Sequence, residues 1–224
     1  MHKNINRIVG DNLMIKLIIF DQDGTLYKKD NELMLYTRKI TKKWLMKRLS
    51  LSKMEVEKLY EELPKKFPNP YLGFMSLGLK VEDYMNEVFD QIAPEKFLEY
   101  NENVYQFFKN NKIPKALVTF ASPTYTKKLQ KVLKVYDYYS KIIFGKDLKT
   151  YSKGEAYAEL INLFKLKCNE VCVVGDDYEN DIKPALALGC KTVWITKKCV
   201  YSCETYAQDI DEFINKKLEM VLYE

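Results

Sequence analysis

Two short acidic clusters carry the residue types in this sequence that are best suited to chemistry. Asp21 and Asp23 lie two residues apart in the segment DQDGTL, directly after the apolar run IKLIIF. Asp176 and Asp181 belong to the segment GDDYEND, directly after the apolar run VCVV. Crowded carboxylates repel one another, so at least one of them must hold a proton or share a cation. Oxygen ligands without His or Cys suit Mg²⁺, so we predict a magnesium site where the two clusters meet.

Each cluster also has a structural interpretation that needs no chemistry. DQDGTL could be an acidic turn at a strand end, because Asp and Gly favour turns. GDDYEND could be a polar loop in which Asn180 or Asp181 caps the next helix. The chemical interpretation is favoured because both clusters follow predicted strands, and open α/β sheets place their sites at the carboxyl ends of the strands.

Two further positions are suited to a phosphate group. Thr119 ends the run KALVT, and its hydroxyl and neighbouring backbone N–H groups, such as that of Phe120, can hold phosphate oxygen; taken alone, it is equally a β-branched strand residue. Lys153 lies in the first turn of a helix predicted from an S-x-x-E capping box. The helix dipole disfavours a cation there by up to about 1 kcal/mol, which indicates a negatively charged ligand nearby. Lys146 and Lys149 are the nearby alternatives.

The composition excludes several classes of site. His2 is the single histidine, which excludes Ser-His-Asp catalysis, Cys-His catalysis and histidine-rich metal sites. The 36 basic and 31 acidic residues give a net charge of +5, and arginine is scarce, so a nucleic acid polymer is not an expected partner. The five cysteines include no CxxC pair, which is typical of reduced thiols in a cytoplasmic protein.

The sequence gives no sign of a membrane association. It has no apolar run of 18 residues, so no membrane span is predicted. Residues 1–13 lack the apolar core of a signal peptide, and we expect a cytoplasmic protein. Because Met14 directly precedes the first strand run, we expect it to be the natural start and residues 1–13 to be an N-terminal extension. Whether the protein is a monomer or a homodimer stays open.

An alternation of strands and helices predicts the fold class. Short apolar runs, nearly continuous in branched residues, are expected to form strands buried on both faces; these runs are residues 15–20, 115–119, 141–144, 171–174 and 191–195. Helices are expected at about 100–110, from Ser122-Pro123, from residue 152, after Asn180 and at about 206–218. This pattern predicts an α/β protein with a doubly wound, Rossmann-like parallel sheet.

The alternation stops between residues 27 and 98, where only helical spacing is found. Ser52 and Glu55 form a capping box there, and Pro64, Pro68 and Pro70 are expected to interrupt the helices. We therefore predict an inserted α-helical cap over residues 29–98 and an α/β core over residues 14–28 plus 99–224. The aromatic segment 67–75 is expected to be a loop that either stacks on a substrate or packs within the cap.

The order of these features resembles a known group of enzymes. DQDGTL, Thr119, Lys153 and GDDYEND look like the four motifs of the haloacid-dehalogenase (HAD) superfamily, over residues 15–196. The helical insertion is similar to the α-helical cap of that superfamily. From Leu77 to the end of GDDYEND, the chain is also similar to pyrimidine-5′-nucleotidase-like phosphatases.

The resemblance implies roles for individual residues. Asp21 would be the nucleophile that forms an aspartyl-phosphate, and Asp23 would be the general acid toward the leaving alcohol and then the general base for water. Asp21, the carbonyl of Asp23 and Asp176 would hold Mg²⁺, and Asp181 would orient a water on that ion. The phosphoryl group would be bound by Thr119, Phe120 and Lys153, although relatives often carry Asn or Gly at the position of Phe120.

The expected function is that of a Mg²⁺-dependent phosphatase acting on a small phosphorylated metabolite, such as a nucleoside 5′-monophosphate or a sugar phosphate. The second aspartate, Asp23, favours phosphate esters, since dehalogenases of the superfamily replace it because halide needs no proton. The alternatives are a phosphomutase that uses the same residues and a non-catalytic, degenerate binding module. Specificity resides in the cap, so the substrate itself is not predicted.

Overall fold

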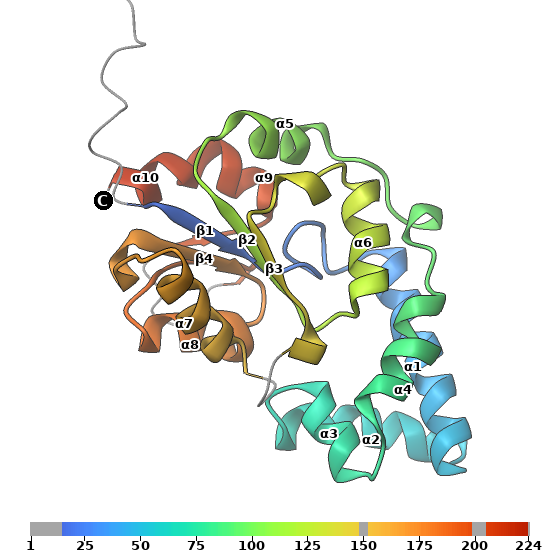
Figure 1. The fold of residues 1–224 in the computed structure, drawn as a ribbon. Helices are drawn as coiled ribbons and strands as arrows, with labels where there is room; N and C mark the ends of the chain where they lie inside the picture. Colours follow the sequence, from blue (N-terminus) through green and yellow to red (C-terminus); the bar gives the residue numbers. More distant parts are fainter. Residues whose placement is uncertain (1–14, 148–151, 199–204, 224) are drawn as a thin grey trace, which may run out of the picture.

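Runs of valine, isoleucine and leucine form the centre of the molecule, in a computed structural model that describes residues 15–147, 152–198 and 205–223. The expected start at Met14, the extension before it and the alternative Lys149 lie outside these residues. The strands form one six-stranded sheet in the order β3-β2-β1-β4-β5-β6, with every pair parallel (Figure 1). They are β1 (Leu17–Phe20), β2 (Lys115–Val118), β3 (Lys141–Ile143), β4 (Val171–Gly175), β5 (Lys191–Ile195) and β6 (Tyr206–Ala207).

The alternation of side chains in β1 shows why both faces of the sheet are covered. Leu17 and Ile19 point to one face of the sheet. They belong to a buried apolar cluster there, which also contains residues of α7 (Lys153–Leu163) and α8 (Lys183–Ala187). Ile18 and Phe20 point to the opposite face. There they meet residues of α5 (Glu102–Asn110), α6 (Pro123–Val132), α9 (Ile210–Glu212) and α10 (Leu218–Tyr223). The predicted doubly wound α/β sheet is confirmed.

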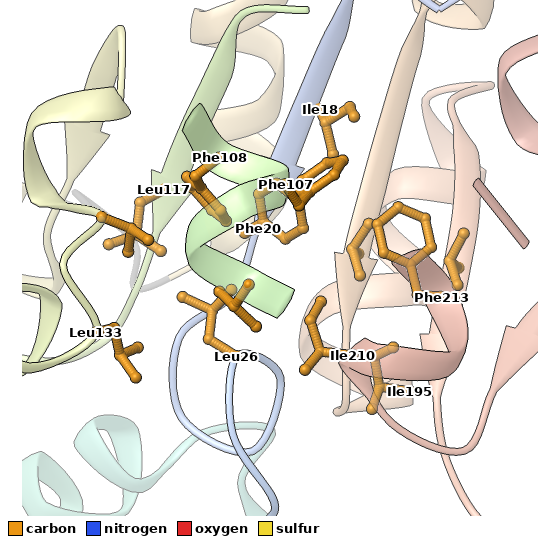
Figure 2. Close-up of a cluster of buried hydrophobic side chains, with 14 of the residues drawn as sticks. Ile18, Phe20, Leu26, Phe107, Phe108, Leu117, Leu133, Ile195, Ile210 and Phe213 are labelled. Atoms are coloured by element: carbon orange, nitrogen blue, oxygen red, sulfur yellow. The ribbon is translucent and has the colours of Figure 1, made fainter. Parts of the chain in front are cut away.

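Aromatic packing fixes the second face. The ring centroid of Phe20 lies 5.3 Å from that of Phe108 and 6.2 Å from that of Phe213. Figure 2 shows these rings gathered with Phe107 beside β1, although they come from three distant parts of the chain. Phe20 is the last residue of β1, so this packing holds the strand end from which the DQDGTL segment leaves.

The predicted strands are confirmed, with ends that differ by at most two residues, but the carboxyl-terminal part of the chain differs from expectation. The prediction of a helix from about residue 206 was wrong at its start, because Tyr206–Ala207 forms the edge strand β6. The backbone N–H of Thr196 donates to the carbonyl of Ala207 at 2.7 Å, so this segment pairs with the side of β5 that β4 leaves open. The helix begins only after Asp209, whose side chain accepts from the N–H of Glu212.

The predicted helical insertion is also confirmed, and it has an interior of its own. Its helices are α1 (Glu32–Leu49), α2 (Lys53–Lys66), α3 (Pro70–Ser76) and α4 (Val81–Glu87). They share one buried apolar cluster, which includes Trp44, Leu45, Phe74, Tyr84 and Met85. Figure 1 shows these helices grouped to one side of the sheet. The boundaries at residues 28 and 99 stay a prediction.

Two local predictions within the cap were wrong. Pro64 lies inside α2 and does not interrupt it; the helix ends at Lys66, shortly before Pro68. The segment 67–75 is mainly the helix α3, with Pro70 as its first residue, because the Asn69 side chain caps it by accepting from the N–H of Leu72 at 3.1 Å. Tyr71 and Phe74 are buried in the cap interior, which matches packing within the cap. The capping box of Ser52 forms as predicted.

Short turns complete the described chain. Single 3₁₀ turns are formed by Phe89–Gln91, Pro94–Lys96, Tyr136–Tyr138, Gly145–Asp147 and Cys168–Glu170, and wider π turns by Tyr178–Ile182 and Phe213–Lys217. Across the described residues, no helix combines the length and the apolar character that a bilayer crossing needs. Cys168, Cys172 and Cys190 carry free thiols, whereas Cys199 and Cys203 lie outside the described residues.

Candidate active site

The strand order places the two acidic segments side by side. The sheet grows from β1 toward β2 on one side and from β4 toward β5 on the other, so its topological switch point lies between β1 and β4. Phe20 at the end of β1 pairs with Val174 near the end of β4. The N–H of Asp21 continues this pairing by donating to the carbonyl of Val174 at 2.9 Å. DQDGTL and GDDYEND therefore follow the carboxyl ends of two neighbouring strands, on the same side of the sheet.

Lys153 connects the acidic groups of the two segments. Its Nζ lies 2.5 Å from Oδ1 of Asp21 and 2.6 Å from Oδ1 of Asp181. All three side chains are buried, with Asp181 and Lys153 at 0% and 3% exposure. Burial lowers the pKa of Lys153, but the carboxylates of Asp181 and Asp21 outweigh burial and hold this pKa well above its ordinary value. The ammonium group therefore keeps its charge.

Asp176 completes a group of three carboxylates. Asp21, Asp176 and Asp181 each offer an oxygen within 4.8 Å of the oxygens of the other two. Burial, together with repulsion from Asp21, raises the pKa of Asp176 to about 6. A set of oxygen donors that repel one another and lack His or Cys fits a hard divalent cation such as Mg²⁺.

Two glycines allow these carboxylates to approach. Gly24 has φ of +92°, and a Cβ there would lie 2.7 Å from Oδ2 of Asp176. A Cβ at Gly175 would overlap the Cβ of Asp181. Both glycines belong to the acidic segments. Each segment therefore contains both a carboxylate of the site and a glycine that leaves room for a carboxylate of the other segment or of its own.

The loop after β4 is shaped differently from the expectation. Asp177, rather than Asn180 or Asp181, caps the following turn, because its side chain accepts from the N–H groups of Glu179 and Asn180. The chain then forms the π turn Tyr178–Ile182 before α8, and Oδ2 of Asp181 accepts from the N–H of Asp177 at 2.9 Å. The wide turn directs Asp181 back toward Lys153; π turns of this kind are frequent at functional sites.

Lys153 is the first residue of α7, as predicted, but for a different local reason. Ser152 precedes the helix without making a side-chain cap hydrogen bond, so the predicted capping box with Glu155 is wrong. The two buried carboxylates hold Lys153 in place instead. Of the two alternatives, Lys149 and the side chain of Lys146 lie outside what the structure describes.

Asp23 lies next to the three carboxylates but has different partners. The hydroxyls of Tyr27 and Tyr125 both donate to its Oδ1, the latter at 3.2 Å, and Nε2 of Gln22 donates to its Oδ2 at 3.2 Å. Burial raises the pKa of Asp23 to about 6; the bond from Tyr27 opposes this shift, and repulsion from Asp21 adds to it. A carboxyl group with a pKa in this range can both give and take a proton near neutral pH.

Thr119 and Phe120 lie beside β1, at the end of β2. The N–H of Thr119 donates to the carbonyl of Ile143, and its Oγ1 accepts from the N–H of Ala121 at 3.1 Å. The ring of Phe120 lies with its centroid 5.1 Å from Nζ of Lys153. The carbonyl of Phe120 accepts from the hydroxyl of Tyr71, so this residue also connects the core to the cap.

Several residues near the site were not predicted. Lys29 donates to Oδ2 of Asp176 at 2.7 Å, and Tyr27, Tyr125 and Gln22 surround Asp23. The nearness of Tyr27 and Lys29 to DQDGTL was the only signal for them in the sequence, and Tyr125 had none. A cavity of about 590 Å³ opens beside Asp176, and its lining includes Lys28, Lys29, Arg38 and Lys197.

The sequence matches a family model described as haloacid dehalogenase-like hydrolase over residues 15–189. A search of curated protein sequences finds no match. The fold is similar to a HAD phosphatase from Thermococcus onnurineus, with a TM-score of 0.65 and 21% identity over 94% of this chain and 100% of that one.

Two further solved structures share the fold. A haloacid dehalogenase-like family hydrolase from Xanthomonas campestris has a TM-score of 0.59 and 14% identity, over 93% of this chain and 96% of that one. The HAD-hydrolase YfnB from Bacillus subtilis, solved bound to magnesium, has a TM-score of 0.58 and 12% identity, over 89% of this chain and 96% of that one. At such identities the likeness shows the fold alone.

Proposed function

Because the chain belongs to the family of haloacid dehalogenase-like hydrolases, we propose that it is a Mg²⁺-dependent phosphatase that hydrolyses a small phosphorylated metabolite through an aspartyl-phosphate on Asp21. The observation that carries this proposal is the buried contact of Lys153 with both Asp21 and Asp181, beside a second acid, Asp23. The arrangement provides a nucleophile, a fixed positive charge and a proton donor at the carboxyl ends of the central strands.

Asp21 is the proposed nucleophile. A carboxylate attacks an anionic phosphate slowly unless the repulsion between the two is neutralised. The ammonium of Lys153 lies 2.5 Å from one oxygen of Asp21, and the hydroxyl of Thr25 lies 3.2 Å from the other. These contacts fix the orientation of the carboxylate while an incoming phosphoryl group takes its place beside the ammonium.

Asp21, Asp176 and Asp181 are proposed to hold Mg²⁺, and the resemblance adds the backbone carbonyl of Asp23. The crowded, mutually repelling carboxylates support this assignment, since a divalent cation relieves their repulsion. Bound there, Mg²⁺ would supply further positive charge to the phosphoryl oxygens, which is the main requirement of phosphoryl transfer.

Asp23 is the proposed acid and base. In the first step it gives a proton to the oxygen of the leaving alcohol while the bond from phosphorus to that oxygen breaks. In the second step it takes a proton from the water that attacks the phosphorus of the aspartyl-phosphate. A halide would need no such proton, so the presence of Asp23 supports phosphate esters over haloacids as substrates.

Thr119, Phe120 and Lys153 are proposed to bind the phosphoryl group. The hydroxyl of Thr119 accepts one N–H bond, which leaves its own hydrogen for a phosphate oxygen. The backbone N–H of Phe120 follows at the same strand end, and the ring of Phe120 has its centroid 5.1 Å from Nζ of Lys153. Nucleoside 5′-monophosphates and sugar phosphates stay the predicted substrates, and the similarity to pyrimidine-5′-nucleotidase-like phosphatases stays a prediction.

The direct test is a screen of the purified full-length chain against phosphorylated metabolites and 4-nitrophenyl phosphate, with Mg²⁺ and with a chelator. We expect Mg²⁺-dependent release of inorganic phosphate that is lost in Asp21→Asn. Transfer of phosphate to a second sugar phosphate, in place of release, would show the phosphomutase alternative. No turnover of any phosphate ester by a folded protein with Mg²⁺ would show the non-catalytic alternative.

A further inference from the structure

The carboxyl group of Asp23 is held by an unusually complete set of donors. Tyr27 and Tyr125 donate to Oδ1, and the amide of Gln22 donates to Oδ2 at 3.2 Å. Tyr27 lies in the turn after β1, whereas Tyr125 lies on α6, and 102 residues separate Tyr125 from Asp23. Three donors from two separate parts of the fold thus converge on one side chain.

The donor from Gln22 is itself fixed by a buried chain of hydrogen bonds. Nε2 of Gln130 donates to Oε1 of Gln22 at 3.0 Å, and the hydroxyl of Tyr139 donates to Oε1 of Gln130 at 3.1 Å. Gln22 and Gln130 are fully buried, at 0% exposure. Because the Gln22 carbonyl is occupied by Gln130, its NH₂ group must face Asp23. A buried polar network in which each member has a partner fixes one arrangement of its side chains.

Both tyrosines act as donors to Asp23. Tyr125 is 1% exposed, and its ring lies 5.1 Å from that of Phe89, so packing holds this ring in place. A tyrosine hydroxyl ordinarily keeps its proton at neutral pH, so Tyr27 and Tyr125 can both donate to Oδ1.

The geometry around Asp23 separates the tasks of its two oxygens. A carboxylate oxygen has two lone pairs, and two tyrosine hydroxyls occupy those of Oδ1. Among the residues that the structure describes, Oδ2 accepts only the bond from Gln22, which leaves it a second position for a proton. A proton that Asp23 exchanges with a ligand is therefore located on Oδ2.

We propose that Tyr27 and Tyr125 are positioning residues that orient Asp23 so that Oδ2 delivers a proton to a poor leaving group. This inference rests on the proposed phosphatase function. The proton moves from Oδ2 to the ester oxygen while the phosphorus–oxygen bond breaks and the bond from Asp21 to phosphorus forms. Oδ2 regains a proton from the water that then hydrolyses the aspartyl-phosphate.

Leaving groups of different basicity test this role. With the full chain and saturating Mg²⁺, kcat and KM are measured for 2,4-dinitrophenyl, 4-nitrophenyl, phenyl and 4-methoxyphenyl phosphate. We expect Tyr27→Phe, Tyr125→Phe and the double variant to lower kcat/KM for phenyl phosphate, by about 10²-fold in the double variant, because kcat/KM reports the steps up to departure of the leaving group. The value of kcat/KM for the dinitrophenyl ester, whose leaving group departs without a proton, should change by less than about 3-fold.

Two controls separate positioning from structure. Tyr84→Phe removes a buried hydroxyl in the cap, which lies 3.0 Å from Oγ1 of Thr41, and should leave the dependence on leaving group unchanged. In Asp23→Asn, which should show the same steep dependence, the tyrosine substitutions should have no further effect. If the double variant does not fold, the single variants Tyr27→Phe and Tyr125→Phe are used for the comparison of leaving groups.

The outcomes for this inference and for the proposed function are distinct. An equal loss of kcat/KM for all leaving groups, or no loss of kcat/KM in the tyrosine variants, overturns the positioning role while Asp21-dependent phosphatase activity stands. An absence of turnover by the wild-type protein for every ester overturns the proposed function, and the inference with it.

Discussion

Nζ of Lys153 and Oδ1 of Asp181 lie 2.6 Å apart and buried, although 28 residues separate them in the sequence. This ion pair connects the first turn of α7 to the π turn after β4, and the same ammonium also contacts Asp21. The site is therefore held together by the charges that are proposed to perform its chemistry.

Removal of Lys153 should destabilise the fold. In Lys153→Met, two buried carboxylates lose their counter-charge, which costs about 3–5 kcal/mol in the free energy of unfolding. Urea denaturation with a chelator measures this loss, and added Mg²⁺ should recover part of it. Lys16→Met is the matched control, because Lys16 lies 2.6 Å from Oε1 of Glu170 but is 54% exposed; it should lose less than about 1 kcal/mol. Equal losses in the two variants would contradict the account.

The acidic segments and the sheet that positions them could be predicted because local patterns encode them. IKLIIF and VCVV are too apolar for anything but buried elements, and the charges that follow them mark the strand ends. The edge strand β6 was missed because two residues, Tyr206–Ala207, carry no periodicity and pair only because β5 has a free edge. Pro64 does not interrupt α2, which continues to Lys66 with the neighbouring Leu63 packed in the cap interior.

The contacts that residues outside the predicted motifs make with Asp23 and Asp176 could not be predicted. Tyr125 reaches Asp23 only because α6 packs over the end of β1, and Lys29 meets Asp176 only through the chain turn after DQDGTL. Ser152 was predicted to cap its helix from spacing alone, whereas buried carboxylates hold the neighbouring Lys153. The spacing of residues in the sequence shows which side chains could take part in a site, but their contacts depend on the packing of the folded chain.

Gly24→Ala should impair metal binding, because the added methyl group would occupy space beside the carboxylate of Asp176. Gly24 has φ of +92°, and a new Cβ would lie 2.7 Å from Oδ2 of Asp176, so this carboxylate must move. Gly78→Ala is the matched control, because Gly78 has φ of +76° and, apart from its chain neighbours, no described residue has an atom within 4 Å of a new Cβ. Both variants should lose about 1 kcal/mol of stability through backbone strain. Only Gly24→Ala should weaken Mg²⁺ binding, by at least about 10-fold in calorimetric titration; equal affinities would refute the role of this contact.

Lys29 should compete with a divalent cation for Asp176. Its ammonium lies 2.7 Å from Oδ2 of Asp176, one of the oxygen donors of the carboxylate group. Lys29→Met removes this competitor and a nearby positive charge, so Mg²⁺ or Mn²⁺ should bind about 2–10-fold more tightly, a gain of about 0.4–1.4 kcal/mol. Titration calorimetry with Mg²⁺ and electron paramagnetic resonance with Mn²⁺ measure it. Lys28→Met, whose partner Asp209 is 3.9 Å away, should have the smaller effect; weaker binding in Lys29→Met would contradict this prediction.

Lys115 should make stability depend on pH in the alkaline range. Burial, with repulsion from Lys112, lowers the pKa of Lys115 from 10.5 to about 8. Between pH 8 and pH 10.5 the unfolded chain binds more protons at this residue than the folded one, so the contribution of Lys115 to stability rises with pH. The wild-type protein should gain about 1–3 kcal/mol relative to Lys115→Met across this window, as measured by urea denaturation. A constant difference would show that Lys115 is charged in the folded protein.

Trapping of the covalent intermediate tests the central claim most directly. The protein is mixed with Mg²⁺ and the best substrate from the screen, quenched in acid during turnover, digested and analysed by mass spectrometry. We predict one phosphoryl group on Asp21 in the peptide that contains DQDGTL, and none in Asp21→Asn, which should also lack turnover. Undiminished turnover by Asp21→Asn, or a phosphoryl group on another residue, would contradict the account.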